Sequence, residues 1–299
     1  MKPPVEPSKE DCCNSGCNPC IFDVYDNQIK LYEKYQEEGC NSYNNADNGI
    51  SQLEYKIFYL LDIVQLSNTQ KILFFQKPNH DQGPKVWWRP GDHFLLKYTS
   101  ENNASCTRAY TPIKLKVSGG CYKDYDFLIV VRKYSNGLVS NYLFNMTIGQ
   151  QTLWRGPYGS YNLQSQKYSR IIMIAQGTGI APFISIIQNI LSNEEDLTRI
   201  VLFYCCKDIN EILFRNELYE FNSYWNFSYK IFLSNTPSES TLTKKYNEPL
   251  VNNKFNVIEL DYFKPNFNDQ YLLCGSIKFM KEYEVVLKNG IYSDSIILF

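Results

Sequence analysis

The hydrophobic pattern changes twice along the chain. Residues 1–50 are mostly polar, apart from Ile21 to Glu38, where apolar positions recur at helical spacing. Residues 51–167 hold short runs of β-branched and aromatic residues between turn signals. Residues 168–299 alternate fully apolar runs with helical patterns. We therefore expect an N-terminal extension with a linker, an all-β domain and an α/β domain with these bounds.

The middle segment predicts a small antiparallel barrel. Its expected strands are Tyr55 to Gln65, Gln70 to Gln76, His93 to Thr99, Ile113 to Val117 and Phe127 to Val131. A further strand carries Arg108 and Tyr110. We expect a short helix to begin after Ser140, because serine is a favourable N-cap.

The last segment predicts a doubly wound α/β domain, since strands and helices alternate. The expected strands are Ile171 to Ala175, Ile200 to Tyr204, Tyr229 to Leu233 and Tyr271 to Cys274. Helices are expected over Pro182 to Leu191 and Ile212 to Phe221.

Composition and charge indicate the cellular location of the protein and the kind of partner it has. The longest apolar stretch, Ile171 to Leu191, is interrupted by glycines and a proline, so we expect no membrane span. No secretory signal is apparent, which predicts a cytoplasmic protein with reduced cysteines; peripheral association with a membrane stays open. Residues 51–168 carry fourteen Lys and Arg against seven Asp and Glu. That excess suits phosphate groups and an acidic protein partner, although an ordinary mixed surface would look the same.

The segment Arg108-Ala109-Tyr110-Thr111-Pro112 has the chemistry that a flavin requires. Arg108 and Tyr110 are two residues apart, so they share one face of a strand. Arginine suits a pyrophosphate, and a tyrosine ring can cover an isoalloxazine. The alternative is a surface arginine beside a core tyrosine, which any barrel could contain.

Three later segments are typical of phosphate and nucleotide binding. Gly137-Leu138-Val139-Ser140 precedes a predicted helix, where backbone N–H groups can approach phosphate oxygens. Gly177-Thr178-Gly179-Ile180-Ala181-Pro182 lies between a strand and a helix, and Pro182 fits the first helical turn. Cys274-Gly275 ends an apolar strand. Each segment alone could be a plain turn or, for Cys274, a core residue.

The ordered set resembles the NADH-cytochrome b5 reductases of the ferredoxin reductase-like flavoprotein superfamily, over about residues 53–299. The resemblance implies a mixed β and α/β fold: a Greek-key FAD-binding barrel, then a doubly wound NAD-binding domain. It implies a monomeric oxidoreductase that takes a hydride from NADH and passes single electrons to a small acidic haem protein such as cytochrome b5, with no nucleic-acid partner.

The resemblance also assigns residues. Thr111 and Cys274 are the expected catalytic positions. The expected cofactor-binding residues are His93, Arg108, Ala109, Tyr110, Thr111, Arg132, Tyr134, Gly137, Leu138, Val139, Ser140, Gly177, Thr178, Gly179, Pro182, Cys274, Gly275 and Phe299.

Two departures and two competitors remain. The loop between Tyr134 and Gly137, which usually helps to hold the FAD adenine, is short. Ser234-Asn235-Thr236 lacks a carboxylate for a ribose hydroxyl, so NADPH remains an alternative donor. The protein could instead reduce a quinone or a ferric chelate. A catalytically degenerate binding or regulatory module is the other competitor.

The cysteine cluster Cys12, Cys13, Cys17 and Cys20 is a candidate site for zinc or an iron–sulfur cluster. Its spacing is tighter than in usual structural zinc sites, and a redox-sensing or partner-binding segment explains it equally well. Residues 3–25 resemble an "oxidoreductase-like" N-terminal module found on some reductase-like proteins.

Overall fold

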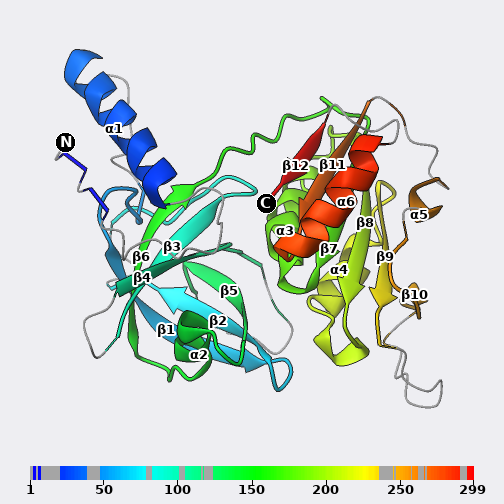
Figure 1. Ribbon diagram of the computed structural model, residues 1–299, viewed down its shortest axis with the longest axis horizontal. Helices are drawn as coiled ribbons and strands as arrows, with labels where there is room; N and C mark the ends of the chain where they lie inside the picture. The colour runs from blue at the N-terminus through cyan, green and yellow to red at the C-terminus, as the bar shows by residue number, and fades with distance from the viewer. Residues whose placement is uncertain are drawn as a thin grey trace. The chain divides into compact units, whose positions relative to one another are not determined.

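The computed structural model describes residues 3–4, 6–7, 21–38, 48–78, 83–100, 105–115, 117, 124–235, 245, 247–256, 258–261, 266, 268–289 and 295–299. The chain forms two compact units (Figure 1). The barrel unit comprises Met1–Ile63, Ile72–Lys114 and Cys121–Ser160, and the parallel-sheet unit comprises Val64–Lys71, Leu115–Gly120 and Tyr161–Phe299.

The barrel unit is built on a six-stranded sheet of order β4-β3-β6-β1-β2-β5. Its elements are α1 (Ile21–Glu38), β1 (Lys56–Gln65), β2 (Gln70–Gln76), β3 (His93–Thr99), β4 (Ser105–Tyr110), β5 (Phe127–Arg132), α2 (Leu138–Phe144) and β6 (Gln151–Tyr158). The last strand, β6, inserts antiparallel between β1 and β3, which is the long return connection of a Greek key.

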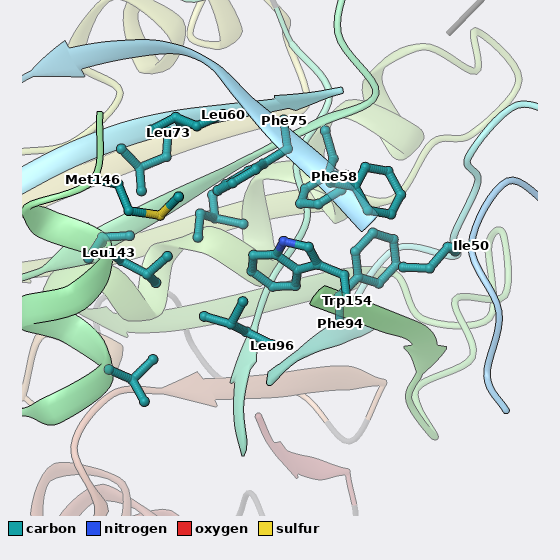
Figure 2. Packing of buried hydrophobic residues seen from close by; sticks show 14 residues of the cluster. Ile50, Phe58, Leu60, Leu73, Phe75, Phe94, Leu96, Leu143, Met146 and Trp154 are labelled. Carbon is teal, nitrogen blue, oxygen red and sulfur yellow. The ribbon is translucent and has the colours of Figure 1, made fainter. Parts of the chain in front are cut away.

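Trp154 of β6 lies at the centre of the barrel core (Figure 2). Its ring centroid is 5.3 Å from those of both Phe75 and Phe127. The indole N–H is fully buried, and it donates to Thr152 Oγ1 at 2.7 Å. Thr152 in turn donates to the Phe58 carbonyl. The polar end of the tryptophan is therefore satisfied, and the aromatic core carries no desolvation penalty there.

The parallel-sheet unit has the strand order β10-β9-β8-β7-β11-β12. Its elements are β7 (Arg170–Gln176), η2 (Gly177–Ile180), α3 (Ala181–Leu191), β8 (Arg199–Cys206), η3 (Ile209–Glu211), α4 (Arg215–Phe221), β9 (Phe227–Leu233), β10 (Leu250–Val251), α5 (Ile258–Asp261), β11 (Asp269–Cys274), α6 (Ile277–Asn289) and β12 (Ile296–Leu298). The chain moves from β7 toward one edge and later returns to place β11 on the other side of β7. The order therefore reverses between β7 and β11, which is a topological switch point.

Residues from α5 and α6 pack against one face of this sheet. Leu260 of α5 and Phe279 of α6 join a cluster that includes Ile172 and Ile174 of β7. The right-handed rule for parallel crossovers places α3 and α4 on the opposite face. The predicted doubly wound arrangement is thus confirmed.

Three local expectations need correction or extension. Residues Ile113 to Val117 were expected to form a strand, but among the described residues of that segment only Ile113 pairs, in an isolated bridge with Leu128. The helix expected from Ile212 begins only at Arg215. Phe214 has a left-handed backbone (φ 56°), and the apolar residues before it are buried in irregular chain instead. The strands β6, β10 and β12 and the helices α5 and α6 were not anticipated.

No helix within the described parts of the chain has the length and apolar character needed to cross a bilayer.

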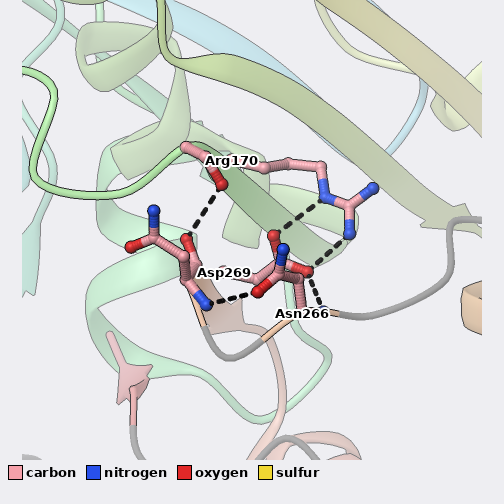
Figure 3. Close-up of polar contacts among 5 residues, drawn as sticks. Arg170, Asn266 and Asp269 are labelled. Carbon is pink, nitrogen blue, oxygen red and sulfur yellow. Dashed lines mark hydrogen bonds and ion pairs between the residues drawn. The ribbon is translucent and has the colours of Figure 1, made fainter.

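A buried ion pair joins the first residues of β7 and β11 (Figure 3). Arg170 Nε lies 3.1 Å from Asp269 Oδ1, and Arg170 Nη2 lies 2.5 Å from Asp269 Oδ2. The backbone N–H of Asn266 also donates to Asp269 Oδ2, at 2.8 Å. The Asp269 side chain is only 1% exposed, so these partners must offset the free energy that its carboxylate loses by leaving water.

We predict that Asp269→Ala lowers the free energy of unfolding by about 3 kcal/mol, because it removes the carboxylate that pairs with the largely buried guanidinium of Arg170. Urea denaturation measures this loss. The control is Glu284→Ala, which breaks the more exposed pair with Lys288 and should cost less than about 1 kcal/mol. Equal losses in the two variants would contradict the prediction.

Candidate functional site

The edge strand β4 presents Arg108 and Tyr110 on one face. In the register with β3, Arg108 pairs with Leu96 and Tyr110 with Phe94. Directly paired residues point to the same side of a sheet, and Leu96 and Phe94 belong to the barrel core. Arg108 and Tyr110 therefore share the inner face, as their spacing predicts. Ala109, between them, is exposed.

The two side chains differ in what holds them. Arg108 Nη1 donates to the Thr107 carbonyl at 2.8 Å, which orients the guanidinium and leaves its other donors for an anion. The Tyr110 ring lies edge-on to Trp154, with centroids 5.9 Å apart. Burial raises the pKa of Tyr110, so its hydroxyl stays neutral. Thr111 follows the strand and is half-buried.

His93 begins β3 and provides a buried imidazole in the same unit. It pairs in register with Tyr158 of β6, next to a register shift between His93 and Leu95. Burial lowers the pKa of His93 to about 4, so the ring is neutral near pH 7. Among the described residues, none hydrogen-bonds its buried Nε2 atom. An unpaired buried nitrogen of this kind suits a polar ligand atom.

The turn between β5 and α2 holds the predicted phosphate segment. The helix α2 begins at Leu138 with Gly137 as N-cap, so the expected start after Ser140 was wrong. The Ser140 hydroxyl instead donates to the Gly137 carbonyl at 3.1 Å and accepts from the Tyr134 N–H at 3.3 Å. A Cβ at Gly137 would lie 2.3 Å from Ser140 Oγ, so this tight turn requires glycine.

Other predicted residues of this turn differ in exposure. Tyr134 and Leu138 are more than half exposed, whereas Val139 and Ser140 are buried. Arg132, the last residue of β5, is half-buried. A ligand at this turn would therefore meet the Tyr134 ring and backbone groups rather than the Val139 side chain.

In the parallel-sheet unit, the glycine loop meets the end of β11. Gly177 has a positive φ of 54°. A Cβ at Gly179 would lie 2.4 Å from the Cys274 carbonyl oxygen, so only glycine allows this approach. Gln176 Oε1 accepts from both the backbone N–H and the hydroxyl of Ser276, at 3.1 and 2.7 Å. These contacts join the carboxyl ends of β7 and β11 at the switch point.

Pro182, Gly275 and Phe299 surround this junction. Pro182 lies in the first turn of α3, as expected. A Cβ at Gly275 would clash with both Gln176 and Phe279, at 2.8 Å. The Phe299 ring packs edge-on against Phe183, and its backbone N–H donates to the Leu273 carbonyl.

Cys274 is half-buried at the end of β11. Its Sγ lies 3.8 Å from the Phe299 carbonyl, to which it donates. Burial raises the pKa of Cys274 to about 12, so the thiol is protonated at neutral pH. Cys274 is thus suited to neutral packing against a ligand and not to nucleophilic chemistry.

The cysteines proposed as metal ligands, Cys12, Cys13, Cys17 and Cys20, lie outside the described residues. Within the described ranges, no cluster of three or more His, Cys, Asp or Glu side chains is arranged to hold a metal ion.

Sequence reasoning missed several polar residues that contact the candidate site residues. Neither Gln176 nor Tyr158 was assigned a role from the sequence. Gln28 was not singled out either, because nothing about a glutamine on a predicted helix indicates that its side chain is buried. The contacts of these residues depend on chain segments that are remote in sequence.

Comparison with known families matches each part of the chain. Residues 58–163 match the oxidoreductase FAD-binding domain, and residues 173–284 match the oxidoreductase NAD-binding domain. Residues 1–40 match the N-terminal domain of oxidoreductase-like proteins. The candidate residues of the barrel unit therefore lie in the FAD-binding match, and most of those of the parallel-sheet unit lie in the NAD-binding match.

Individual relatives agree with this. An NADH-cytochrome b5 reductase-like protein of Homo sapiens is 29% identical over 99% of this chain and 94% of its own length. NADH-cytochrome b5 reductase 2 of Coccidioides immitis is 38% identical over 53% of this chain and 47% of its own length.

Solved structures show the same fold. The cytochrome b5 reductase domain of Ulva prolifera nitrate reductase superposes with a TM-score of 0.68 at 21% identity, over 84% of this chain and all of that domain. The CS-b5R domains of human Ncb5or give 0.68 at 18% identity, over 85% of this chain and 71% of that one. The chain is a homologue of the NADH-cytochrome b5 reductase-like proteins, an oxidoreductase with FAD-binding and NAD-binding domains behind an oxidoreductase-like N-terminal segment.

Proposed function

We propose that the protein takes a hydride from NADH onto bound FAD and passes single electrons to a haem protein such as cytochrome b5. The observation that supports the nucleotide half is the approach of Gly179 to the Cys274 carbonyl, because it brings the glycine loop against the end of β11 at the switch point of an NAD-binding domain. The names of the relatives support the acceptor class.

The residues of the barrel unit fit FAD. The remaining guanidinium donors of Arg108 would bind the pyrophosphate, and Tyr110 and Thr111 would meet the isoalloxazine. The unpaired Nε2 of His93 would face the flavin side of Thr111. The Gly137–Ser140 turn would offer backbone N–H groups to phosphate oxygens, with Arg132 and Tyr134 beside it. When bound, FAD accepts two electrons as a hydride and releases them singly.

The residues of the parallel-sheet unit fit the nicotinamide nucleotide. Gly177, Thr178 and Gly179 would offer a narrow backbone surface to its phosphates, ahead of Pro182 and the start of α3. Cys274 would pack its neutral thiol beside the nicotinamide ring. Gly275 and Phe299 would bound the same space and help to exclude water.

Charge supports a protein acceptor of acidic surface. Residues 51–168, which include all of the FAD-binding match, have twice as many basic as acidic side chains. A positive surface accelerates encounter with an acidic haem protein, and salt screens that attraction.

The wild-type protein tests the proposal directly. We expect purified protein to be yellow, to lose its flavin absorbance on anaerobic addition of NADH, and to reduce cytochrome b5 at a rate that falls as salt rises. A colourless protein that takes up no added FAD would contradict the proposal. Reduction of a quinone or ferric chelate, but of no haem protein, would favour a different acceptor.

The preferred nucleotide follows from the end of β9. Ser234 and Asn235 are exposed there and carry no carboxylate to bind a ribose 2′-hydroxyl. The described residues after β8 include Asp208, two positions beyond Cys206, and Asp208 Oδ1 accepts from the Asn210 N–H at 3.0 Å. We predict a higher kcat/KM with NADH than with NADPH. Steady-state rates with each nucleotide test this, and a clear preference for NADPH would refute the assignment.

We predict that Arg108→Ala weakens FAD binding, because a charge-assisted phosphate contact contributes about 1.5–3 kcal/mol. That loss corresponds to a dissociation constant roughly 10–150-fold higher. Fluorescence titration of apoprotein with FAD measures it. Arg89→Ala is the matched control, since Arg89 is an exposed arginine of the same unit. Equal FAD affinities in the two variants would remove Arg108 from the site.

We predict that Gly179→Ala lowers kcat/KM for NADH by about 100-fold, because the new methyl group must displace the end of β11. Flavin content should stay at the wild-type level, since FAD binds the other unit. Gly149→Ala is the control: nothing lies within 4 Å of the added carbon, and its positive φ of 90° strains an alanine there, so any backbone strain weighs on the control and not on Gly179. A Gly179 variant as active as the Gly149 variant would argue against a nucleotide at this junction.

A further inference from the structure

Helix α1 belongs to the oxidoreductase-like N-terminal segment, yet one of its polar side chains is buried in the barrel unit. Gln28 is only 6% exposed. A buried amide destabilises a protein unless its donors are paired, and both hydrogens on Gln28 Nε2 have partners. They are the Gln52 carbonyl at 2.6 Å and the Tyr158 hydroxyl at 3.1 Å.

These contacts form a closed network. The Tyr158 hydroxyl accepts from Gln28 and donates to the same Gln52 carbonyl. The Gln52 side chain donates to the Pro157 carbonyl, one residue before Tyr158. Gly156 N–H donates to the Ser51 carbonyl at 2.9 Å, which ties the same two segments together. Because the members satisfy one another, the Tyr158 hydroxyl has one favoured position.

The ring of Tyr158, whose hydroxyl is held in this network, lies beside the imidazole of His93. The two residues are register partners across β3 and β6, and their ring centroids are 6.1 Å apart. The register shift beside His93 interrupts the regular ladder, so the neighbouring side chains contribute more to fixing the direction of its ring. On β6, the Arg155 guanidinium lies 6.0 Å from the Tyr158 ring and 4.8 Å from the Tyr55 ring.

We propose that Gln28 is a positioning residue for the flavin edge: helix α1 fixes the Tyr158 hydroxyl through Gln28, and Tyr158 fixes the imidazole of His93. Helix α1 of the N-terminal segment then contributes directly to the geometry of the flavin-binding site. This inference rests on the proposed function, since it requires FAD beside His93 and Thr111.

The decisive variant is Gln28→Glu, which keeps the shape of the side chain but removes both donors and places a carboxylate against the Gln52 carbonyl. Asn27→Asp is the matched control, because it makes the same chemical change at the adjacent, exposed position of α1. Gln28→Met removes the donors without adding charge, and it replaces Gln28→Glu if that variant does not fold.

We expect the Gln28 variants to retain FAD, to shift the visible flavin absorbance bands and to lower kcat roughly tenfold, as loss of a supporting hydrogen bond does at other sites. KM for NADH should not change, because the nucleotide binds the other unit. Asn27→Asp should match the wild type in FAD retention, absorbance bands, kcat and KM for NADH. A purely structural role would lower stability and leave the spectrum and kcat of the folded protein unchanged.

A double-variant cycle tests the route through Tyr158. If Gln28 acts through that hydroxyl, Gln28→Glu adds little to the loss of kcat already caused by Tyr158→Phe. Fully additive losses would overturn the route.

The two proposals fail separately. A wild-type protein that binds no flavin overturns the proposed function. A wild-type protein that is reduced by NADH, with Gln28 variants indistinguishable from Asn27→Asp, overturns this inference alone.

Discussion

The strands β7 and β11 are almost a hundred residues apart in the sequence, and they are neighbours at the switch point of the parallel sheet. At their carboxyl ends there is no space for a side chain at position 179. The Cys274 carbonyl occupies the space that a Cβ would need, and Gln176 holds Ser276 beside it. This approach places a glycine loop, the start of α3 and the end of β11 at one point. The nucleotide-binding proposal depends on that geometry, because phosphates bind to backbone N–H groups at the start of a helix.

The barrel unit is subject to a different constraint: it must bury enough apolar surface to be stable and still offer polar groups to a large charged cofactor. Trp154 and its aromatic neighbours provide the core, with the indole N–H satisfied internally. The edge strand β4 then carries Arg108 and Tyr110 on its inner face, with Tyr110 packed against that core. In the proposed function, these two residues are the ones that meet the cofactor.

Much of the fold could be predicted because burial periodicity is a local property. The helix α1 was expected over Ile21 to Glu38 and has those bounds, and the strand positions of β2 and β3 were likewise predicted. The errors arose where specific contacts override residue preference. Ser140 is a good N-cap residue, but its hydroxyl is engaged by the turn at Tyr134 and Gly137, so Gly137 caps α2 instead. Ile113 makes only an isolated bridge with Leu128.

The sequence by itself determined most of the element types, the order of the motifs and the identity of the two cofactor-binding domains, because each of these depends on residues close together in the chain. Tertiary structure decided which polar side chains are buried and what they contact. Gln28 and Tyr158 are separated by 130 residues, and His93 lies between them in the sequence. Such contacts form only when β6 inserts beside β3 and α1 packs against the barrel unit. No local pattern encodes that pairing, since the stabilisation comes from burying and satisfying groups supplied by different elements.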